Sequence, residues 1–392
     1  MPLYFWPLAG TLLMQTVTSV MFLTVPVLAP ALAADVGFDP SRIGIYTALL
    51  FAGAMPVSLV MGSLAGRFGP LRVMQIGILV SCLGLLFSMA GALPVVLTCA
   101  VLVGMGYGPN TPGAAHMLAR VTSPRERPLV FSIKQSGAPL GGFLAGLLVP
   151  WVVVGAGWRE ALVVSAVIGL LTVLAVQPLR AQADDERRPD RSISVQGSWT
   201  QLRMLFADSD LRRLTLASFT YSSVQACLFT FLVTYLVERV GLSLVSAGLA
   251  YSCMHIVGVV ARISWGWLAD RLVPARLVLA GLGAASALSV LLVAWFTPAW
   301  PFWAMAAVAG AAGATASGWN GVFLAEIARV APPDQISAAT GGTVFFTYFG
   351  LVVGPTVFSA VVAFAGYDGA FYLMAGLVLL AGLSILPRRA KG

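Results

Sequence analysis

The chain divides into about twelve apolar stretches, each close to 20 residues long and separated from the next by a short polar turn. About 20 helical residues, rising 1.5 Å each, cross the roughly 30 Å hydrocarbon core of a bilayer. Barrel strands would instead alternate in polarity over about 10 residues. Because lipid leaves no partner for exposed backbone groups, we predict helices. The predicted spans are 6–33, 43–65, 72–92, 95–119, 129–153, 160–178, 213–237, 245–269, 276–297, 301–327, 338–363 and 368–386.

The composition excludes a soluble globular domain. Apolar residues make up 59% of the chain and charged residues only 10%, whereas soluble domains have about 45–50% and about 25%. The expected fold class is therefore all-α integral membrane.

The basic residues predict the orientation in the membrane. The net charge of +8 is not gathered into a stripe that binds nucleic acid. Most of the 23 lysines and arginines fall on one predicted side, including those of the long loop 179–212 and of the C-terminal residues Arg388, Arg389 and Lys391, while the other side has only Arg42, Arg159 and Arg239. The positive-inside rule then predicts a multi-pass protein of the inner membrane with both termini cytoplasmic.

An internal repeat divides the chain into two halves. Residues 62–72 align with residues 266–276 at an offset of 204, and further matches follow later in the chain at an offset of 209. The matched residues of the first pair are Gly62, Leu64, Ala65, Arg67, Pro70 and Arg72 with Gly266, Leu268, Ala269, Arg271, Pro274 and Arg276. We therefore predict two pseudo-symmetric six-helix bundles, residues 1–178 and 213–392, joined by the cytoplasmic loop 179–212. In transporters built from parallel repeats, substrate is held near the midplane between the halves.

The two copies of this motif resemble the loop signature of the major facilitator superfamily. The copy in the first half has Gly66 where an acid is usual, and the second copy keeps Asp270. The motifs Gly350-x-x-x-Gly354-Pro355 and Gly137-x-Pro139-x-Gly141-Gly142 are similar to the family's Gly-Pro helix motif. The resemblance implies the major facilitator fold of twelve transmembrane helices, with gating contacts made by Asp270 and by the loop arginines Arg67, Arg72, Arg271 and Arg276. The alternative is that these arginines only mark topology.

Ionisable residues inside the spans are the first candidates for a site, because a charge at the bilayer centre costs about 2.5–3.5 kcal/mol on insertion scales. His116, Lys134, His255 and Arg262 lie clearly inside spans, and no Asp or Glu does. A cavity lined by cations without carboxylates favours an anionic substrate as the missing partner.

Lys134 and Arg262 have matching predicted depths, roughly 8 Å and roughly 10 Å from the cytoplasmic helix ends. The stretch from Ala261 to Asp270 resembles span eight of monocarboxylate and oxalate porters, which implies that Arg262 contacts a substrate carboxylate; in the superfamily's fold, Lys134 would face the same cavity. Gly258 stands where monocarboxylate porters have an acid, which puts their proton-coupling scheme in doubt. Alternatively, both long side chains snorkel to the headgroups.

His255 is the predicted candidate for proton coupling. It precedes Arg262 by seven residues and therefore shares its helical face. An imidazole titrates near pH 6.5, which suits a proton relay. A neutral packing histidine is the alternative, and His116 is assigned a structural role.

Polar and aromatic residues complete the predicted substrate site. Asn110 and the pair Trp319-Asn320 are favoured, because they lie in corresponding Gly/Pro-interrupted stretches of spans four and ten. Helix–helix hydrogen bonds would satisfy such groups equally well. The further candidates are Gln15, Tyr46, Gln135, Tyr221, Gln225 and Tyr348.

The sequence shows no phosphate-binding Gly loop, zinc-ligand spacing or nucleophile elbow. We therefore expect a transporter, not an enzyme, without cofactor or metal, working as a monomer whose partners are the bilayer, a small organic anion such as a carboxylate, and protons. Two alternatives stay open: a proton-coupled exporter of drugs or metabolites, and a membrane sensor that transports nothing.

Overall fold

The computed structural model describes residues 4–123, 126–185, 187–188, 190, 205–332 and 336–386. Every regular element in these ranges is a helix. The C-terminal basic residues Arg388, Arg389 and Lys391, and much of the predicted loop 179–212, lie outside them. Contacts between Cα atoms divide the chain into two units, Met1–Gln196 with Ser243–Gly248, and Gly197–Leu242 with Leu249–Gly392. The predicted domain boundaries stay predictions.

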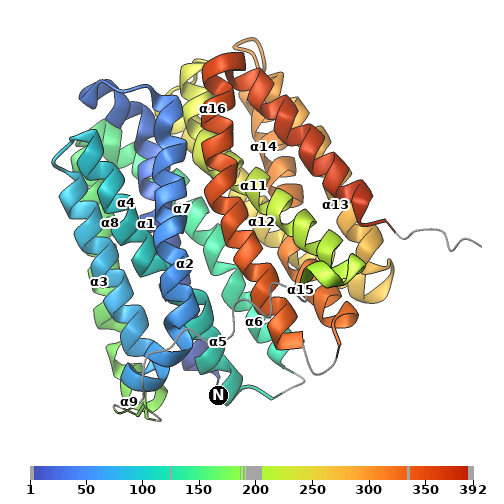
Figure 1. Ribbon diagram of the computed structural model, residues 1–392. Helices are drawn as coiled ribbons and strands as arrows, with labels where there is room; N and C mark the ends of the chain where they lie inside the picture. Colours follow the sequence, from blue (N-terminus) through green and yellow to red (C-terminus); the bar gives the residue numbers. More distant parts are fainter. Residues whose placement is uncertain are drawn as a thin grey trace, which may run out of the picture. The chain divides into compact units, whose positions relative to one another are not determined.

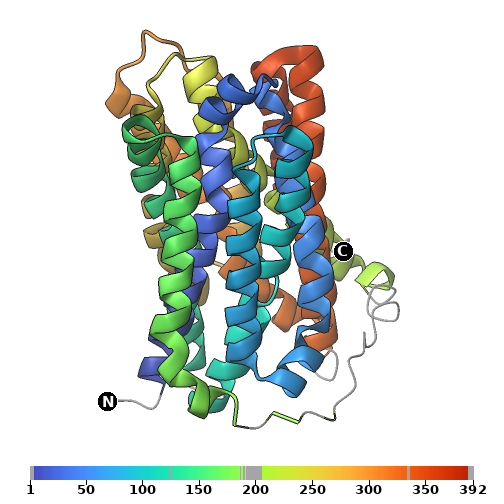
Figure 2. The ribbon, with the colours of Figure 1, turned by 90° about the vertical axis from the view of Figure 1, so that its left-hand side faces the viewer.

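Unit 1 is a bundle in which α1 packs on α7 and α8, and α4 packs on both α2 and α3 (Figure 1, Figure 2). Phe22, Phe51 and Tyr107 form a cluster of rings that joins α1, α2 and α4. Its helices are α1 (Phe5–Val36), η1 (Pro40–Arg42), α2 (Ile43–Phe68), α3 (Pro70–Ser88), α4 (Leu93–Tyr107), α5 (Asn110–Val121), α6 (Arg127–Gln135), α7 (Gly137–Gly155), α8 (Trp158–Val176), η2 (Gln177–Leu179) and α9 (Arg180–Ala183).

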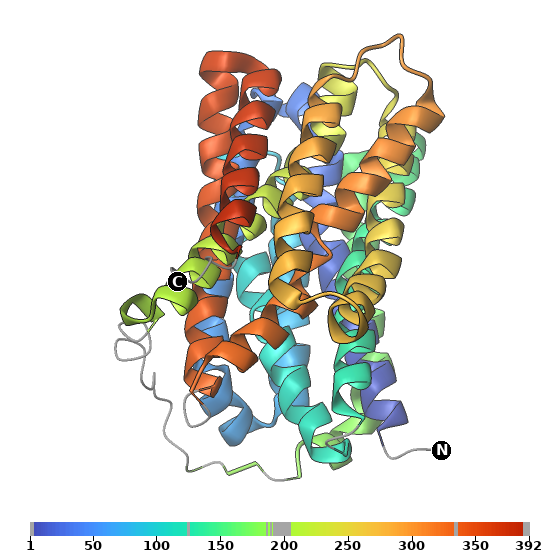
Figure 3. The ribbon, with the colours of Figure 1, turned by 90° about the vertical axis from the view of Figure 1, so that its right-hand side faces the viewer.

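Unit 2 is organised around its longest helix. This helix, α16, packs on α11 and α13, and its two arms meet at a sharp bend (Figure 1, Figure 3). The bend includes Gly366, whose φ of 68° is readily adopted only by glycine. The helices are α11 (Ser209–Glu238), α12 (Leu244–Arg271), whose first turn belongs to unit 1, α13 (Ala275–Ala294), α14 (Phe302–Ala316), α15 (Trp319–Val330) and α16 (Ile336–Ser384).

In the described part of the chain, ten helices are long and apolar enough to cross a membrane. The number is lower than the twelve predicted spans for two structural reasons. Span 301–327 is broken into α14 and α15, each too short alone, and the last two spans are the arms of α16. The large apolar side chains that point outward, such as Phe364 at 92% and Trp303 at 73% exposure, are placed to contact lipid. The chain thus has the predicted all-α membrane fold.

The repeat recurs in the packing of each unit. A Cβ atom on Gly104 of α4 would lie 1.7 Å from the carbonyl oxygen of Leu50, and one on Gly313 of α14 would lie 1.8 Å from that of Met254. Leu50 and Met254 correspond at the offset of 204, and the two glycines correspond at 209. Only glycine allows this approach, so both halves use the same close crossing of their second and fourth helices.

Candidate functional site

Lys134 is a buried ammonium held by amides. It lies in the last turn of α6, where the helix dipole favours a cation, and is 2% exposed. Its Nζ atom donates to Oε1 of Gln15 on α1 at 2.8 Å and to Oε1 of the neighbouring Gln135 at 3.2 Å. Among the residues that the structure describes, no carboxylate pairs with it. The side chain does not snorkel to the surface, and its charge is left without a counter-ion there.

Asn110 lies beside the same face of α1. It is the first residue of α5, directly after the Gly108-Pro109 interruption, and is 2% exposed. Its amide nitrogen donates to the carbonyl oxygen of Met14 at 3.2 Å and to the hydroxyl of Thr18. Its Oδ1 atom is buried and has no hydrogen-bond partner in the structure. Asn110 and Lys134 therefore both contact α1, at neighbouring positions.

Arg262 lies on α12 in unit 2, where it contacts the break between α14 and α15. Its Nη2 atom donates to the carbonyl oxygen of Ser317 at 2.9 Å, and the Trp265 indole donates to that of Ala314, also at 2.9 Å. Carbonyl groups at a helix C-terminus lack helical partners and attract cations. The half-buried guanidinium is therefore positioned by the broken span.

Trp319 and Asn320 begin α15 on the other side of that break. The Trp319 indole and the Asn320 amide both donate to Oε1 of Gln225 on α11, at 3.1 Å and 3.4 Å. Trp319 is 1% exposed and packs on Tyr221, with ring centroids 5.6 Å apart. Trp319 corresponds to Asn110 at the offset of 209. In each half, the helix after the break thus reaches the first helix of its own unit.

His255 is enclosed by aromatic rings on the Arg262 helix. Its ring centroid lies 4.4 Å from that of Phe229 and 4.6 Å from that of Tyr251, and the residue is 1% exposed. Neither imidazole nitrogen has a hydrogen-bond partner in the structure. The last predicted residue of the site, Tyr348, lies half buried on α16.

Asp270 and Arg276 of the second loop signature line a cavity of about 860 Å³. Arg276 donates to Glu326 and to Asp210, at 2.7 Å in each case, and Arg329 also bonds Glu326. Glu326, 1% exposed, is thereby neutralised by two arginines. Arg271 ends α12, and among the described residues no atom from another part of the chain lies within 4 Å of where a Gly266 Cβ would be.

The first loop signature is completed by a residue that the sequence did not single out, Asp184. Its carboxylate accepts from the backbone N–H groups of Leu71 at 2.9 Å and Arg72 at 3.1 Å, at the start of α3. Burial raises the pKa of Asp184, and these two N–H groups act in the opposite direction. The absence of an acid at Gly66 was the available signal that a carboxylate must come from elsewhere. Arg67 stacks on Phe68, and Gly62 has open space beside it.

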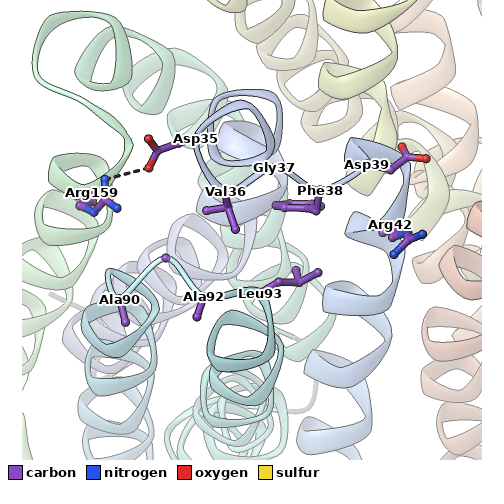
Figure 4. A pocket seen from close by; sticks show the side chains of 11 residues that line it. Asp35, Val36, Gly37, Phe38, Asp39, Arg42, Ala90, Ala92, Leu93 and Arg159 are labelled. Carbon is purple, nitrogen blue, oxygen red and sulfur yellow. Dashed lines mark hydrogen bonds and ion pairs between the residues drawn. The ribbon is translucent and has the colours of Figure 1, made fainter.

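A second cavity, of about 680 Å³, opens at the other end of unit 1 (Figure 4). Its arginines Arg42 and Arg159 are matched by Asp35 and Asp39, and Arg159 pairs with Asp35 at 3.1 Å. This cavity contains none of the predicted site residues and has no excess of positive charge. It therefore lacks the chemistry expected for an anion site.

The structure brings the predicted residues together in two groups. Lys134, Gln135 and Asn110 gather around α1, while Arg262, Trp319 and Asn320 gather around the break in unit 2. These groups belong to different units. A cavity shared by Lys134 and Arg262 stays a prediction.

Repeated bundles of apolar helices, with polar clusters buried inside them, define a polytopic membrane protein of the two-half type. The family model of the Major Facilitator Superfamily matches residues 11–341. The chain belongs to this superfamily, as its loop signatures indicated.

Relatives and solved structures agree with this assignment. The chain is 24% identical to the hexuronate transporter of Bacillus subtilis, over 91% of this chain and 88% of that protein. It is 23% identical to a probable hexose phosphate transport protein of Chlamydia trachomatis, over 91% and 85%. A bacterial homologue of the human lysosomal transporter Spinster, solved in an inward-facing and occupied conformation, superposes with a TM-score of 0.76 at 16% identity, over 98% of this chain and 96% of that chain.

Proposed function

We propose that this protein is a secondary transporter that moves a small organic anion, in particular a carboxylate, across the inner membrane by alternating access. The observation that carries the proposal is the buried Lys134 ammonium, which the described residues supply with amides but with no carboxylate. Burying an uncompensated charge is costly, so a substrate anion is the natural counter-ion. Two relatives support this, because their names describe transport of anions, a hexuronate and a hexose phosphate.

Arg262 is proposed as the cation that the second half contributes. Its planar guanidinium bonds the Ser317 carbonyl through Nη2. Guanidinium groups bind carboxylates in a two-pronged geometry that an ammonium does not offer. The proposed division of roles gives Arg262 the orientation of the carboxylate and Lys134 the compensation of its charge.

The test is uptake of radiolabelled carboxylates into proteoliposomes. We expect Lys134→Met and Arg262→Ala each to abolish uptake. Arg42→Gln, which changes an exposed arginine that belongs to neither cluster, should retain it. Unchanged uptake in both variants would refute the anion site. Export of unrelated cationic dyes by the wild type would instead support the exporter, and a purified protein that transports no tested compound would favour the sensor.

His255 is proposed as the group that couples transport to protons. It is the buried imidazole nearest in sequence to Arg262, and its two nitrogens have no partner in the structure. An imidazole can accept and donate a proton, so its place on the helix of the proposed anion-binding arginine suits a proton relay.

A further inference from the structure

The orientation of the Asn110 amide is determined by its neighbours. Thr18 donates its only hydroxyl proton to the carbonyl oxygens of Met14 and Gln15, at 2.7 Å and 3.2 Å. The Thr18 oxygen can therefore only accept from Asn110, and the Met14 carbonyl can only accept as well. Both neighbours require the nitrogen of Asn110, so the atom left without a partner is the acceptor Oδ1.

Lys134 provides the complementary group, an N–H donor that is left for another acceptor. An ammonium has three N–H donors, and the two glutamines accept from Lys134 at 2.8 Å and 3.2 Å, which leaves one donor for another acceptor. Gln15, which holds Lys134, and Thr18, which holds Asn110, are three residues apart on α1. Side chains at this spacing lie about 5–6 Å apart on one helix face. The donor of Lys134 and the acceptor of Asn110 are thus held by α1 residues that are neighbours on one helix face.

We propose that the substrate is a hydroxylated carboxylate, whose carboxylate oxygen accepts from Lys134 and whose hydroxyl donates to Oδ1 of Asn110. This inference rests on the proposed transport of organic anions and adds the hydroxyl. A simple carboxylate would satisfy Lys134 but leave the oxygen of Asn110 unpaired, as it is without substrate, so it would bind less tightly than a hydroxy acid that gains this hydrogen bond. Asn110 is then a residue that determines specificity, since it separates a hydroxy acid from its deoxy analogue.

The test compares matched pairs of acids on the purified full-length protein. Lactate against propionate and gluconate against hexanoate differ in hydroxyl groups and keep the carboxylate. We expect the hydroxy acid of at least one pair to compete for uptake about 5- to 150-fold better and to raise the melting temperature more. In Asn110→Leu, this preference should fall to near one while carboxylate binding persists. Lys134→Met should lose both acids of the pair, and Thr98→Val, an exposed position on α4, should keep the wild-type preference.

The outcomes separate the two proposals. If hydroxy and deoxy acids bind equally to the wild type, the inference about Asn110 is wrong and the anion proposal stands. If no carboxylate binds, both fail. If the preference survives in Asn110→Leu, the hydroxyl is recognised elsewhere and the assignment is overturned. Asn110→Ser, which removes Oδ1 with a smaller change in polarity, provides the same comparison if the leucine variant does not fold.

Discussion

At the residue scale, the cluster of Lys134, Gln15, Gln135 and Asn110 has two energetic costs that a purely structural cluster would avoid. A buried ammonium is held by neutral amides, and a neighbouring amide oxygen is left without a donor. Buried polar groups in proteins are nearly always paired, and the exceptions call for an explanation. A site that must bind and release an anion supplies one, because a permanent carboxylate partner would compete with the substrate.

The stability of this cluster gives the first prediction. Gln15→Leu alone should lower the free energy of unfolding by about 1–3 kcal/mol, because it removes the 2.8 Å acceptor of a buried charge. The double variant Gln15→Leu with Lys134→Met should recover most of this loss, since both polar partners become apolar. Thermal unfolding in detergent measures the cycle. If the losses of the two single variants simply add in the double variant, the contribution of Lys134 to stability does not depend on Gln15. That result would contradict the prediction.

The second prediction concerns His255. If this imidazole relays protons, uptake by His255→Gln should lose its dependence on external pH while some transport down the anion's own gradient remains. Glutamine keeps hydrogen-bonding capacity but does not titrate in this range. Initial uptake rates measured between about pH 5.5 and about pH 8 provide the test. A pH profile that matches the wild type would make His255 a packing residue between Phe229 and Tyr251.

At the scale of the element, α3 begins with its first N–H groups bound by a residue far along the chain. Asp184 is 5% exposed and takes the place of an N-cap, the role that Asp208 plays locally for α11. Gly69, with a φ of 94°, makes room, because a Cβ there would lie 2.2 Å from the Asp184 carboxyl carbon. The segment after α9 is thereby fixed to the loop between α2 and α3.

The third prediction follows from this cap. Asp184→Ala should lower the free energy of unfolding by about 1–2 kcal/mol, as loss of an N-cap does. Asp184→Asn should cost less, because burial raises the pKa of Asp184 and the neutral amide avoids the charge. A raised pKa means that stability from this carboxyl is complete below about pH 4 and falls as the pH rises. The melting temperature of the wild type should therefore decline relative to Asp184→Asn between about pH 4 and about pH 7. The exposed Asp185→Ala is the matched control, and an equal loss there would contradict the cap.

The helices and their interruptions also show how much of the fold can be predicted from the sequence. Hydropathy and the loop signatures predict the spans, the repeat and the family, because these depend on local composition. The interruptions at Gly108-Pro109 and before Trp319 are also visible, since Gly and Pro break helices locally. The hydrogen bonds that Asn110 donates to Met14 and that the Leu71 N–H donates to Asp184 are not predictable in this way, because each joins segments about a hundred residues apart and depends on tertiary packing.

At the scale of the whole molecule, the two halves conserve the position of an ion pair and reverse its sign. Asp35 of α1 pairs with Arg159 of α8 at 3.1 Å, and Arg239, directly after α11, pairs with Asp368 of α16 at 3.8 Å. Asp35 corresponds to Arg239 at the offset of 204, and Arg159 corresponds to Asp368 at 209. What the halves share is a tie, that is, an ion pair that links the ends of their first and sixth helices. They do not share which of the two helices carries the positive charge.

The fourth prediction is that these two ties differ in strength. Exposed ion pairs contribute about 0–1 kcal/mol, and all four side chains here are 44–59% exposed. The Asp35 carboxylate also accepts from the Trp158 indole at 3.0 Å, and Arg159 stacks on that ring at 4.2 Å. The side chains therefore lose less conformational entropy when they form this pair, and the distance between the charged atoms is shorter than in the second pair. A double-mutant cycle on Asp35→Asn and Arg159→Gln should give a coupling near the top of the range, and one on Arg239→Gln and Asp368→Asn a coupling near zero.

Salt separates the two contributions to the first tie. About 0.5 M salt should weaken the Asp35–Arg159 coupling, because exposed charges are screened, while the stacking of Arg159 on Trp158 persists in part. Equal couplings in the two cycles would contradict the role of Trp158. They would mean that each ion pair is stabilised by charge alone. The coupling free energy would then be the same whichever of the two helices carries the arginine.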